Sequence, residues 1–170
     1  SMGVDICLIA GTGFCLQSPV PVLSPTVYAE IKLAAGSALQ IPAEHAERGV
    51  RLFPCATRLA EQPLLAGLKH LNRLEQVLAR AEWQGNDCSE GLMCDSSGRV
   101  IEGVYSNLFL VRDGGLFTAE LSRCGVAGVM RAEILQQAQL LGVPVTVGDI
   151  RYDELLAADE VFVCNSLYGI

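Results

Sequence analysis

Two apolar segments joined by a tight turn place the strongest constraint on how this chain can fold. The segment from Asn107 to Arg112 is followed by Asp113-Gly114-Gly115 and then by a second apolar segment, Leu116 to Ala119. Asp-Gly pairs favour the short turns that connect antiparallel strands, because the turn positions need left-handed backbone angles. The sequence therefore predicts an antiparallel β-hairpin over these residues.

Further strands and helices are expected on both sides of this hairpin, which together predict an α+β fold. Helices are expected at 68–83, 129–141 and 153–158, and the other strands at 5–10, 50–55, 91–95, 100–102, 144–147 and 160–164. Gly142 should end the second helix as a left-handed cap. The expected apolar faces are Leu71, Leu74, Leu78 and Ala81 in the first helix, and Val129, Ile134, Leu135, Ala138 and Leu141 in the second.

Charge and composition exclude several classes of protein. Twelve basic residues against 19 acidic ones give a net charge of −7, which argues against general nucleic-acid binding because that requires a basic face. The longest uncharged stretch, 6–29, contains three prolines and is not a credible membrane span. Apolar residues make up 51% of the chain, an excess that an oligomer interface or a missing domain would explain.

The cysteines indicate neither a metal site nor a disulfide framework. There are seven, and no two have Cys-x-x-Cys spacing. Scattered thiols suit the reducing cytoplasm, and each is expected to be a small core residue. The seven are Cys7, Cys15, Cys55, Cys88, Cys94, Cys124 and Cys164.

Lysine is rare in this sequence, so any chemistry that needs a covalent imine has few candidates. Lys32 and Lys69 are the only lysines, and one of them would have to form the bond. Lys69 is expected where a loop enters a helix, which would hold it on a rigid element. A solvated lysine at a helix start is the plainer interpretation of the same position.

Three other motifs have both a chemical and a plain structural interpretation. Glu102 lies between apolar residues, and a buried carboxylate needs a cation such as a protonated ring nitrogen; it could equally face solvent at a strand edge. The glycines at 125 and 128 would free the first amides of a helix to bind a phosphate, or form an ordinary loop. Asn165 and Ser166 follow a buried strand, where either ligand contacts or a turn can occur.

Taken together, these motifs supply a lysine, a ring-nitrogen carboxylate and a phosphate cradle, the three parts that bind pyridoxal phosphate. The stretch 65–78, Leu-Ala-Gly-Leu-Lys-His-Leu-Asn-Arg-Leu-Glu-Gln-Val-Leu, resembles the signature of bacterial aminodeoxychorismate lyases. Stretches 102–109, 124–131 and 157–166 are similar to the same family, in the same order. The resemblance implies the larger C-terminal domain of a fold-type IV enzyme, with a mixed sheet or pseudo-barrel and flanking helices.

The resemblance also implies a function and a set of site residues. It implies a homodimeric enzyme of folate synthesis that uses pyridoxal 5′-phosphate to convert 4-amino-4-deoxychorismate into 4-aminobenzoate and pyruvate, without nucleic-acid or membrane partners. The lysine that bonds to the cofactor and acts as the catalytic base matches Lys69. The other matches are Glu102 at the ring nitrogen, Val126 against the ring, the amides of Val129 and Met130 and the hydroxyl of Ser166 at the phosphate, and Asn165 beside the substrate.

The resemblance implies a division of the chain and leaves two alternatives open. Residues 1–44 are expected to be a poorly matched segment and linker, and 45–170 the cofactor-binding domain, ending early, with the family's small N-terminal domain absent. We therefore expect this chain alone to be a weak or inactive lyase. A fold-type IV aminotransferase of D- or branched-chain amino acids would use the same residues, although the run from His70 to Gln76 disfavours it. A non-catalytic fragment or dimerisation domain is the other alternative.

Overall fold

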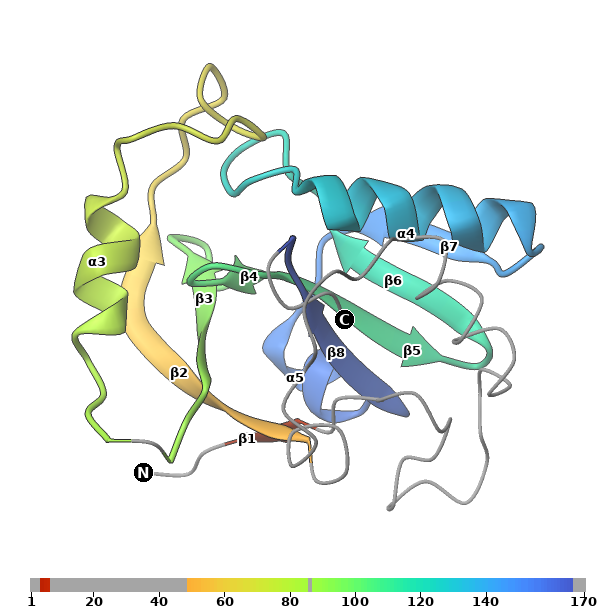
Figure 1. Cartoon of the computed structure of the whole chain (residues 1–170), viewed down its shortest axis with the longest axis horizontal. Helices are drawn as coiled ribbons and strands as arrows, with labels where there is room; N and C mark the ends of the chain where they lie inside the picture. The colour runs from red at the N-terminus through yellow and green to blue at the C-terminus, as the bar shows by residue number, and fades with distance from the viewer. Residues whose placement is uncertain (1–3, 7–48, 86, 167–170) are drawn as a thin grey trace.

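A computed structural model describes residues 4–6, 49–85 and 87–166 of the 170-residue chain. The helices are α3 (Leu74–Arg80), α4 (Val129–Leu140) and α5 (Tyr152–Leu156) (Figure 1). The strands are β1 (Val4–Ile6), β2 (Val50–Leu59), β3 (Glu90–Asp95), β4 (Val100–Gly103), β5 (Asn107–Arg112), β6 (Gly115–Ala119), β7 (Val145–Gly148) and β8 (Glu160–Cys164).

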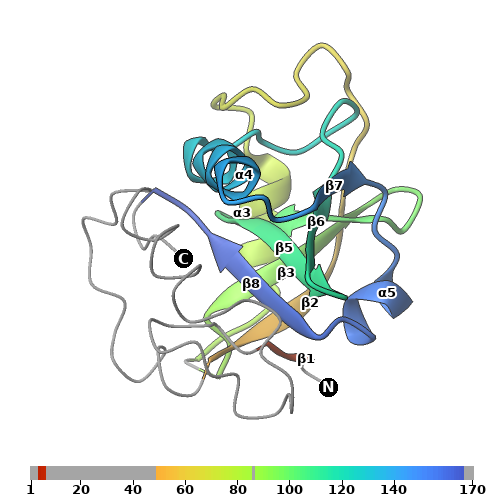
Figure 2. The ribbon, with the colours of Figure 1, turned by 90° about the vertical axis from the view of Figure 1, so that its right-hand side faces the viewer.

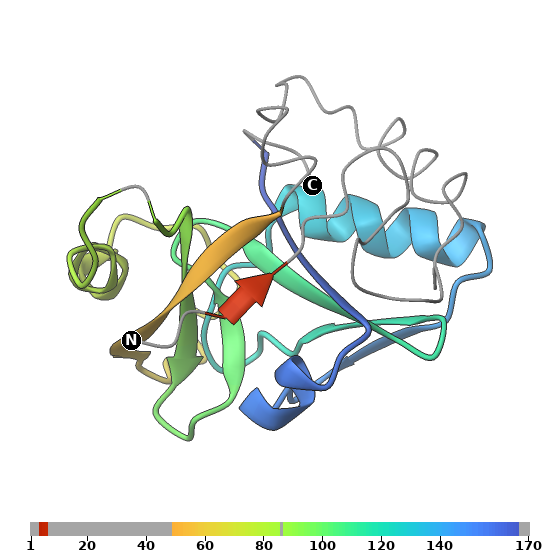
Figure 3. The ribbon, with the colours of Figure 1, turned by 90° about the horizontal axis from the view of Figure 1, so that it is seen from below.

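The strands form one mixed sheet. Their order is β1-β2-β3-β4-β5-β6-β7, and β8 pairs with β5. The pairs β2–β3 and β6–β7 are parallel and the rest are antiparallel. Each parallel pair is connected through a helix, α3 or α4, as parallel strands require, and these helices flank the sheet (Figures 1 and 2). The sheet curls so that β1 also contacts β8 (Figure 3). The predicted α+β fold with a mixed sheet and flanking helices is confirmed.

The predicted hairpin is confirmed and lies at the centre of the sheet. Asp113 and Gly114 have φ angles of 50° and 78°, which are the left-handed angles that this class of turn requires. The first strand of the hairpin, β5, also pairs with β8 along nearly its whole length. On β5, Phe109 is fully buried and stacks on Phe162 of β8 with ring centroids 5.1 Å apart, so the core includes both strands.

The predicted helix at 68–83 is shorter than expected. It begins at Leu74 and ends at Arg80, because earlier carbonyl groups have other partners. The backbone N–H of Arg73 binds the carbonyl of Leu71 at 2.8 Å, and its guanidinium donates to the carbonyls of His70 and Leu68. These contacts replace the regular i to i−4 bonds of a helix.

The expected apolar face of this helix is wrong, because it points outward. Leu71 is fully exposed and Leu74 is 68% exposed, whereas Gln76 and Ala79 are buried. In α4, Ile134 and Ala138 are buried as expected, but Val129 and Leu141 are exposed. We call the exposed residues along 64–78 the apolar stripe: Leu64, Leu68, Leu71, Leu74, Val77 and Leu78.

The cysteines within the described residues behave mostly as predicted. Cys55, Cys94, Cys124 and Cys164 are buried free thiols, and Cys88 is half-buried. Burial raises the pKa of Cys164 to about 12, so its thiol stays protonated at neutral pH. Expectations for residues 7–48, which include Cys7 and Cys15, lie outside the described residues.

Two kinds of feature are absent from the described residues. None of the helices there is long and apolar enough to cross a membrane. That part of the chain also contains no group of three or more His, Cys, Asp or Glu side chains placed to hold a metal ion.

Candidate active site

The loop that carries Lys69 is hydrogen-bonded to residues 125–128, which precede α4 and which we call the glycine loop. The N–H of Gly67 donates to the carbonyl of Gly125 at 2.9 Å, and the N–H of Ala127 donates to the carbonyl of Gly67 at 3.0 Å. Lys69 follows two residues later, in an exposed position before α3. Two of the motifs found in the sequence, 58 residues apart by the Gly67–Gly125 bond, are therefore neighbours.

The same glycine loop reaches Glu102 on β4. The N–H of Val126 donates to the Glu102 carboxylate at 2.8 Å. Gly125 has φ of 87°, and a Cβ there would lie 2.8 Å from the side chains of Ile101 and Leu121. Only glycine allows this approach, which explains why the sequence has a glycine at this point.

Glu102 is buried in an environment that disfavours its charge. It is 3% exposed, and burial raises the pKa of its carboxyl group to about 7. The hydrogen bond from Val126, the positive charge of Arg73 and the side chain of Gln76 oppose this rise, whereas the charge of Glu90 adds to it. A cation placed against this carboxylate would stabilise its ionised form, and a protonated ring nitrogen is such a cation.

The N-terminus of α4 offers amide donors to an anion. Gly128 is the N-cap residue, with φ −67° and ψ 148°, and no side chain caps the helix. Val129 and Met130 are the first two helical residues; the side chain of Val129 is exposed and that of Met130 is buried. First-turn amides without a cap favour a bound phosphate. The buried carboxylate and these amides therefore fit the two ends of a phosphorylated pyridine.

Asn107 connects these parts and was missed as a site residue by the sequence analysis. Its side-chain amide donates to the carbonyl of Val126 at 2.8 Å, and its oxygen accepts the N–H of Gly128 at 3.1 Å. A Cβ on Gly128 would lie 2.2 Å from that oxygen. The signal was present, because Asn107 lies within the similar stretch 102–109 and five residues after Glu102.

Asn165 and Ser166 lie at the same end of the sheet. Asn107 pairs with Cys164 in the β5–β8 register, so the two residues after Cys164 continue beyond the start of β5. Asn165 is half-buried and Ser166 is exposed. The structure therefore brings these two residues to the end of β5 that contacts the glycine loop.

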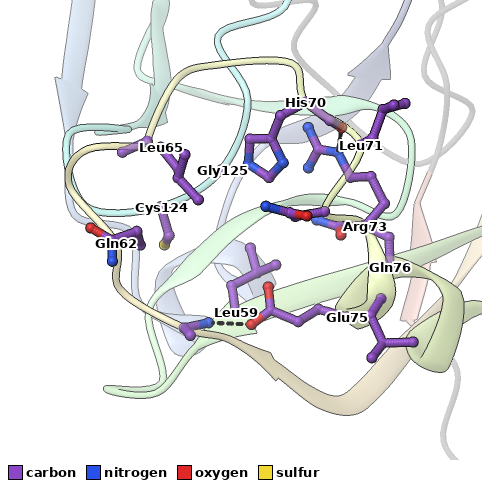
Figure 4. Close-up of a pocket in the computed structure, with 14 residues that line it drawn as sticks. Leu59, Gln62, Leu65, His70, Leu71, Arg73, Glu75, Gln76, Cys124 and Gly125 are labelled. Carbon is purple, nitrogen blue, oxygen red and sulfur yellow. Dashed lines mark hydrogen bonds between the residues drawn. The ribbon is translucent and has the colours of Figure 1, made fainter.

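A cavity of about 460 Å³ lies beside Lys69's loop (Figure 4). Its lining comes from the end of β2, residues 60–76 and the glycine loop, and Lys69 does not contribute to it. Among the described residues, Nδ1 of His70 and Oε1 of Gln76 are buried in this lining without a hydrogen-bond partner. Gln76 also hydrogen-bonds to the side chain of Glu102. The cavity therefore lies next to a residue that contacts this carboxylate.

Arg73, another lining residue, was also missed as a site residue. Its Nε donates to the carbonyl of His70 at 3.2 Å and its Nη2 to that of Leu68 at 3.5 Å. These carbonyls belong to the residues directly before and after Lys69, so Arg73 holds the lysine in place. The signal was its position in the run from His70 to Gln76.

The chain is similar in sequence and structure to several known proteins. The chain is 43% identical to the aminodeoxychorismate lyase of Vibrio harveyi over 173 residues, which cover 100% of this chain and 61% of that protein. The 4-amino-4-deoxychorismate lyase from Pseudomonas aeruginosa has a similar structure, with a TM-score of 0.74 and 64% identity over 76% of this chain and 48% of that one.

An aminotransferase structure also matches, and the coverage of all these relatives is partial. A branched-chain amino acid aminotransferase solved with pyridoxamine 5′-phosphate has a TM-score of 0.62 and 30% identity, over 68% of this chain and 38% of that one. The chain thus spans less than two thirds of the length of each relative. The sequence model of the class IV aminotransferases matches residues 28–170. The chain therefore belongs to the class IV aminotransferase family.

Proposed function

We propose that this chain carries the cofactor-binding domain, residues 45–170, of an aminodeoxychorismate lyase. The reaction is the conversion of 4-amino-4-deoxychorismate into 4-aminobenzoate and pyruvate, with pyridoxal 5′-phosphate as the cofactor. The observation that carries the proposal is the hydrogen-bonded contact between Lys69's loop and the glycine loop that binds Glu102. The 43% identity to the Vibrio harveyi lyase supports the choice of reaction.

In this proposal each end of the cofactor has its own set of residues. Lys69 forms the covalent bond, Glu102 faces the ring nitrogen and Val126 packs against the ring. The phosphate is held by the amides at the start of α4, those of Val129 and Met130, and by the hydroxyl of Ser166. Bound pyridoxal phosphate supplies an electron sink for the negative charge that develops on the substrate.

The residues of the chain then carry the proton transfers. Once its amine is free, Lys69 would remove the proton at C4 of the substrate as a general base. Glu102 stays ionised and holds a proton at the ring nitrogen. The C3–oxygen bond breaks, the substrate ring becomes aromatic, and Lys69 returns its proton to the departing enolpyruvate, which becomes pyruvate. The conversion needs neither water nor an oxidant. In this proposal Asn165 lies beside the substrate.

One observation favours the lyase over the aminotransferase, which would use the same Lys69 and Glu102. The run from His70 to Gln76 distinguishes the lyase resemblance, and two of its members act on the site. Arg73 binds the carbonyls on both sides of Lys69, and Arg73 and Gln76 both lower the pKa of Glu102. This run therefore interacts with both the loop of Lys69 and the carboxylate of Glu102.

We also propose that two copies of the chain associate through the apolar stripe, and that the protein works in the cytoplasm. Five leucines and a valine are exposed within fifteen residues of sequence in this stripe, including Leu71 at 100% exposure, and so many exposed apolar side chains are unusual on a free surface. The stripe adjoins Lys69, which suits a dimer whose interface borders the active site. The buried free thiols of Cys55 and Cys94 suit a reducing compartment.

The decisive experiment asks whether the chain binds pyridoxal phosphate through Lys69. The purified chain is titrated with the cofactor, reduced with borohydride and digested, and the modified peptide is identified by mass spectrometry. We expect the label on Lys69, and its loss in Lys69→Ala. Lys32→Ala is the matched control, because it removes the only other lysine, and it should keep the label. A wild-type chain that takes up no label would refute the proposal.

Activity then separates the reactions. Pyruvate released from 4-amino-4-deoxychorismate, and absent in Lys69→Ala, would support the lyase. Transfer of the amino group of D-alanine or a branched-chain amino acid to 2-oxoglutarate, with no pyruvate released from 4-amino-4-deoxychorismate, would favour the aminotransferase. Label on Lys69 with neither activity would favour the non-catalytic alternative.

A further inference from the structure

Glu90, the first residue of β3, is a buried carboxylate that the proposed mechanism does not use. It is 3% exposed, and its carboxylate accepts the N–H of its neighbour Gly91 at 2.8 Å. It also accepts the N–H of Val104 at 3.0 Å, that of Tyr105 at 3.4 Å and the hydroxyl of Ser106 at 2.6 Å. A buried charge is costly unless such donors surround it, so this arrangement is specific.

Three of the four donors belong to the loop that joins β4 to β5. The loop is closed by a hydrogen bond from the N–H of Gly103 to the carbonyl of Ser106 at 2.7 Å. A Cβ at Gly103 would lie 2.3 Å from the Ser106 hydroxyl and 2.8 Å from the Glu90 carboxyl carbon. The carboxylate of Glu90 therefore fills the inside of this loop and accepts hydrogen bonds from three of its residues.

The two ends of the loop are site residues. Glu102 and Asn107 face each other as the register pair of β4 and β5. Glu102 accepts the N–H of Val126, and Asn107 binds the carbonyl of Val126 and the N–H of Gly128. A change in the shape of the loop would therefore move the carboxylate of Glu102 and the side chain of Asn107 together.

We propose that Glu90 is a positioning residue that sets Glu102 and Asn107 through the 103–106 loop, and through them both ends of the cofactor. This inference rests on the proposed function, since it assumes that pyridoxal phosphate occupies the site. Glu90 itself touches neither the cofactor nor the substrate. Its contribution is the fixed shape of one loop, which a hydrogen-bonding carboxylate provides and an amide of the same size does not.

The test replaces Glu90 by glutamine. Glu90→Gln keeps the volume of the side chain but turns one of its acceptors into an NH2 group, which meets a backbone N–H or hydroxyl and leaves a donor unpaired. Amide hydrogen exchange is measured on the cofactor-free chain, and cofactor affinity by titration. We expect faster exchange in 102–107 and 125–128, and pyridoxal phosphate affinity that is weaker by about tenfold.

Glu82→Gln is the matched control. The carboxylate of Glu82 also accepts two backbone N–H groups and a hydroxyl. The donors are the N–H of Ala56 at 2.6 Å and the N–H and hydroxyl of Thr57 at 2.7 and 2.5 Å, and both residues belong to β2. The Glu82→Gln variant should lower the thermal midpoint of unfolding while leaving amide exchange in 102–107 and cofactor affinity unchanged. Equal losses of affinity in Glu82→Gln and Glu90→Gln would overturn the inference, because they would reflect general destabilisation.

A milder variant keeps the test decisive if Glu90→Gln does not fold. Ser106→Ala removes one donor and leaves the carboxylate, so it should produce a smaller change of the same kind, with exchange in 102–107 faster and affinity about threefold weaker. Unchanged exchange in both Ser106→Ala and Glu90→Gln would refute the role of Glu90. A wild-type chain that binds no cofactor would instead refute the proposed function, while the exchange data still report on the loop.

Discussion

At the scale of single residues, Glu102 is a buried carboxyl group whose charge has only weak compensation within the chain. Burial raises its pKa to about 7, and the N–H of Val126 and the charge of Arg73 only partly oppose this. Without a cation against it, the ionised carboxylate costs stability in the folded state. A positively charged ring nitrogen would remove that cost, so the same feature that destabilises the cofactor-free chain favours cofactor binding.

We predict that Glu102→Gln stabilises the cofactor-free chain at pH 8 but not at pH 4.5. The carboxyl group has an ordinary pKa of 4.5 and a folded value of about 7, so the folded state holds the proton more tightly. Stability is therefore lost as pH rises from about 4.5 to 7, by on the order of 3 kcal/mol. Glutamine does not ionise and avoids this loss.

Urea unfolding at several pH values measures the difference in free energy between the variant and the wild-type chain. The difference should grow with pH across this window and then level off. Glu133→Gln, on the half-exposed side of α4, controls for the removal of a carboxylate in general. A difference that is the same at pH 4.5 and pH 8 would contradict the prediction.

At the scale of elements, the turn between β5 and β6 holds the central hairpin in register. Arg112 pairs with Gly115 across the turn, and Asp113 and Gly114 both have left-handed angles. Since β5 begins at Asn107, the register of this hairpin also decides where the anchor of the glycine loop lies. The turn and the site are thus connected through one strand.

We predict that Gly114→Ala lowers the free energy of unfolding by about 1 kcal/mol, because an L-residue is strained at φ of 78°. No atom lies within 4 Å of the added Cβ, so backbone strain is the only cost. Gly148→Ala is the matched control: that Cβ is also free of contacts, and the φ of Gly148 is not left-handed. Urea unfolding should show a loss in the first variant alone, and equal stabilities would show that the turn carries no strain.

At the scale of the whole molecule, α3 buries polar Gln76, whereas the apolar stripe, on α3 and the segment before it, is exposed. Leu71, Leu74 and Leu78 are exposed, whereas Gln76 is buried in the cavity lining, to which Leu71 and Leu74 also contribute. A helix with its apolar side outward is stable only when something covers that side. This is the structural basis for the proposed homodimer.

We predict that Leu71→Lys weakens dimerisation at least tenfold, because it places a charge in the proposed apolar interface. Sedimentation equilibrium of the purified chain gives the dissociation constant. Leu140→Lys is the matched control, since Leu140 is 70% exposed and lies on α4, outside the stripe. A wild-type chain that is monomeric, or equal weakening by both variants, would contradict the proposed interface.

Sequence alone determined most of the elements, because their signals are local. The turn at Asp113-Gly114, the strands at 107–112 and 160–164, and the start of α4 after Gly128 all occur where they were predicted. The candidate residues Lys69, Glu102, Val126 and Met130 were also recognisable, since they lie in three stretches that resemble the lyase family: 65–78, 102–109 and 124–131. Their roles remain predictions that the experiments above can test.

Only the tertiary structure decided which residues meet and which face is buried. Gly67 pairs with Gly125 and Ala127 although they lie far apart in the chain. Asn107 and Glu90 bind backbone groups in other loops, and Arg73 binds the carbonyls of Leu68 and His70. No periodicity in the sequence reveals these contacts. The outward face of α3 follows for the same reason: apolar spacing identifies a face to be covered, but the arrangement of the whole chain decides whether its own core or a partner covers it.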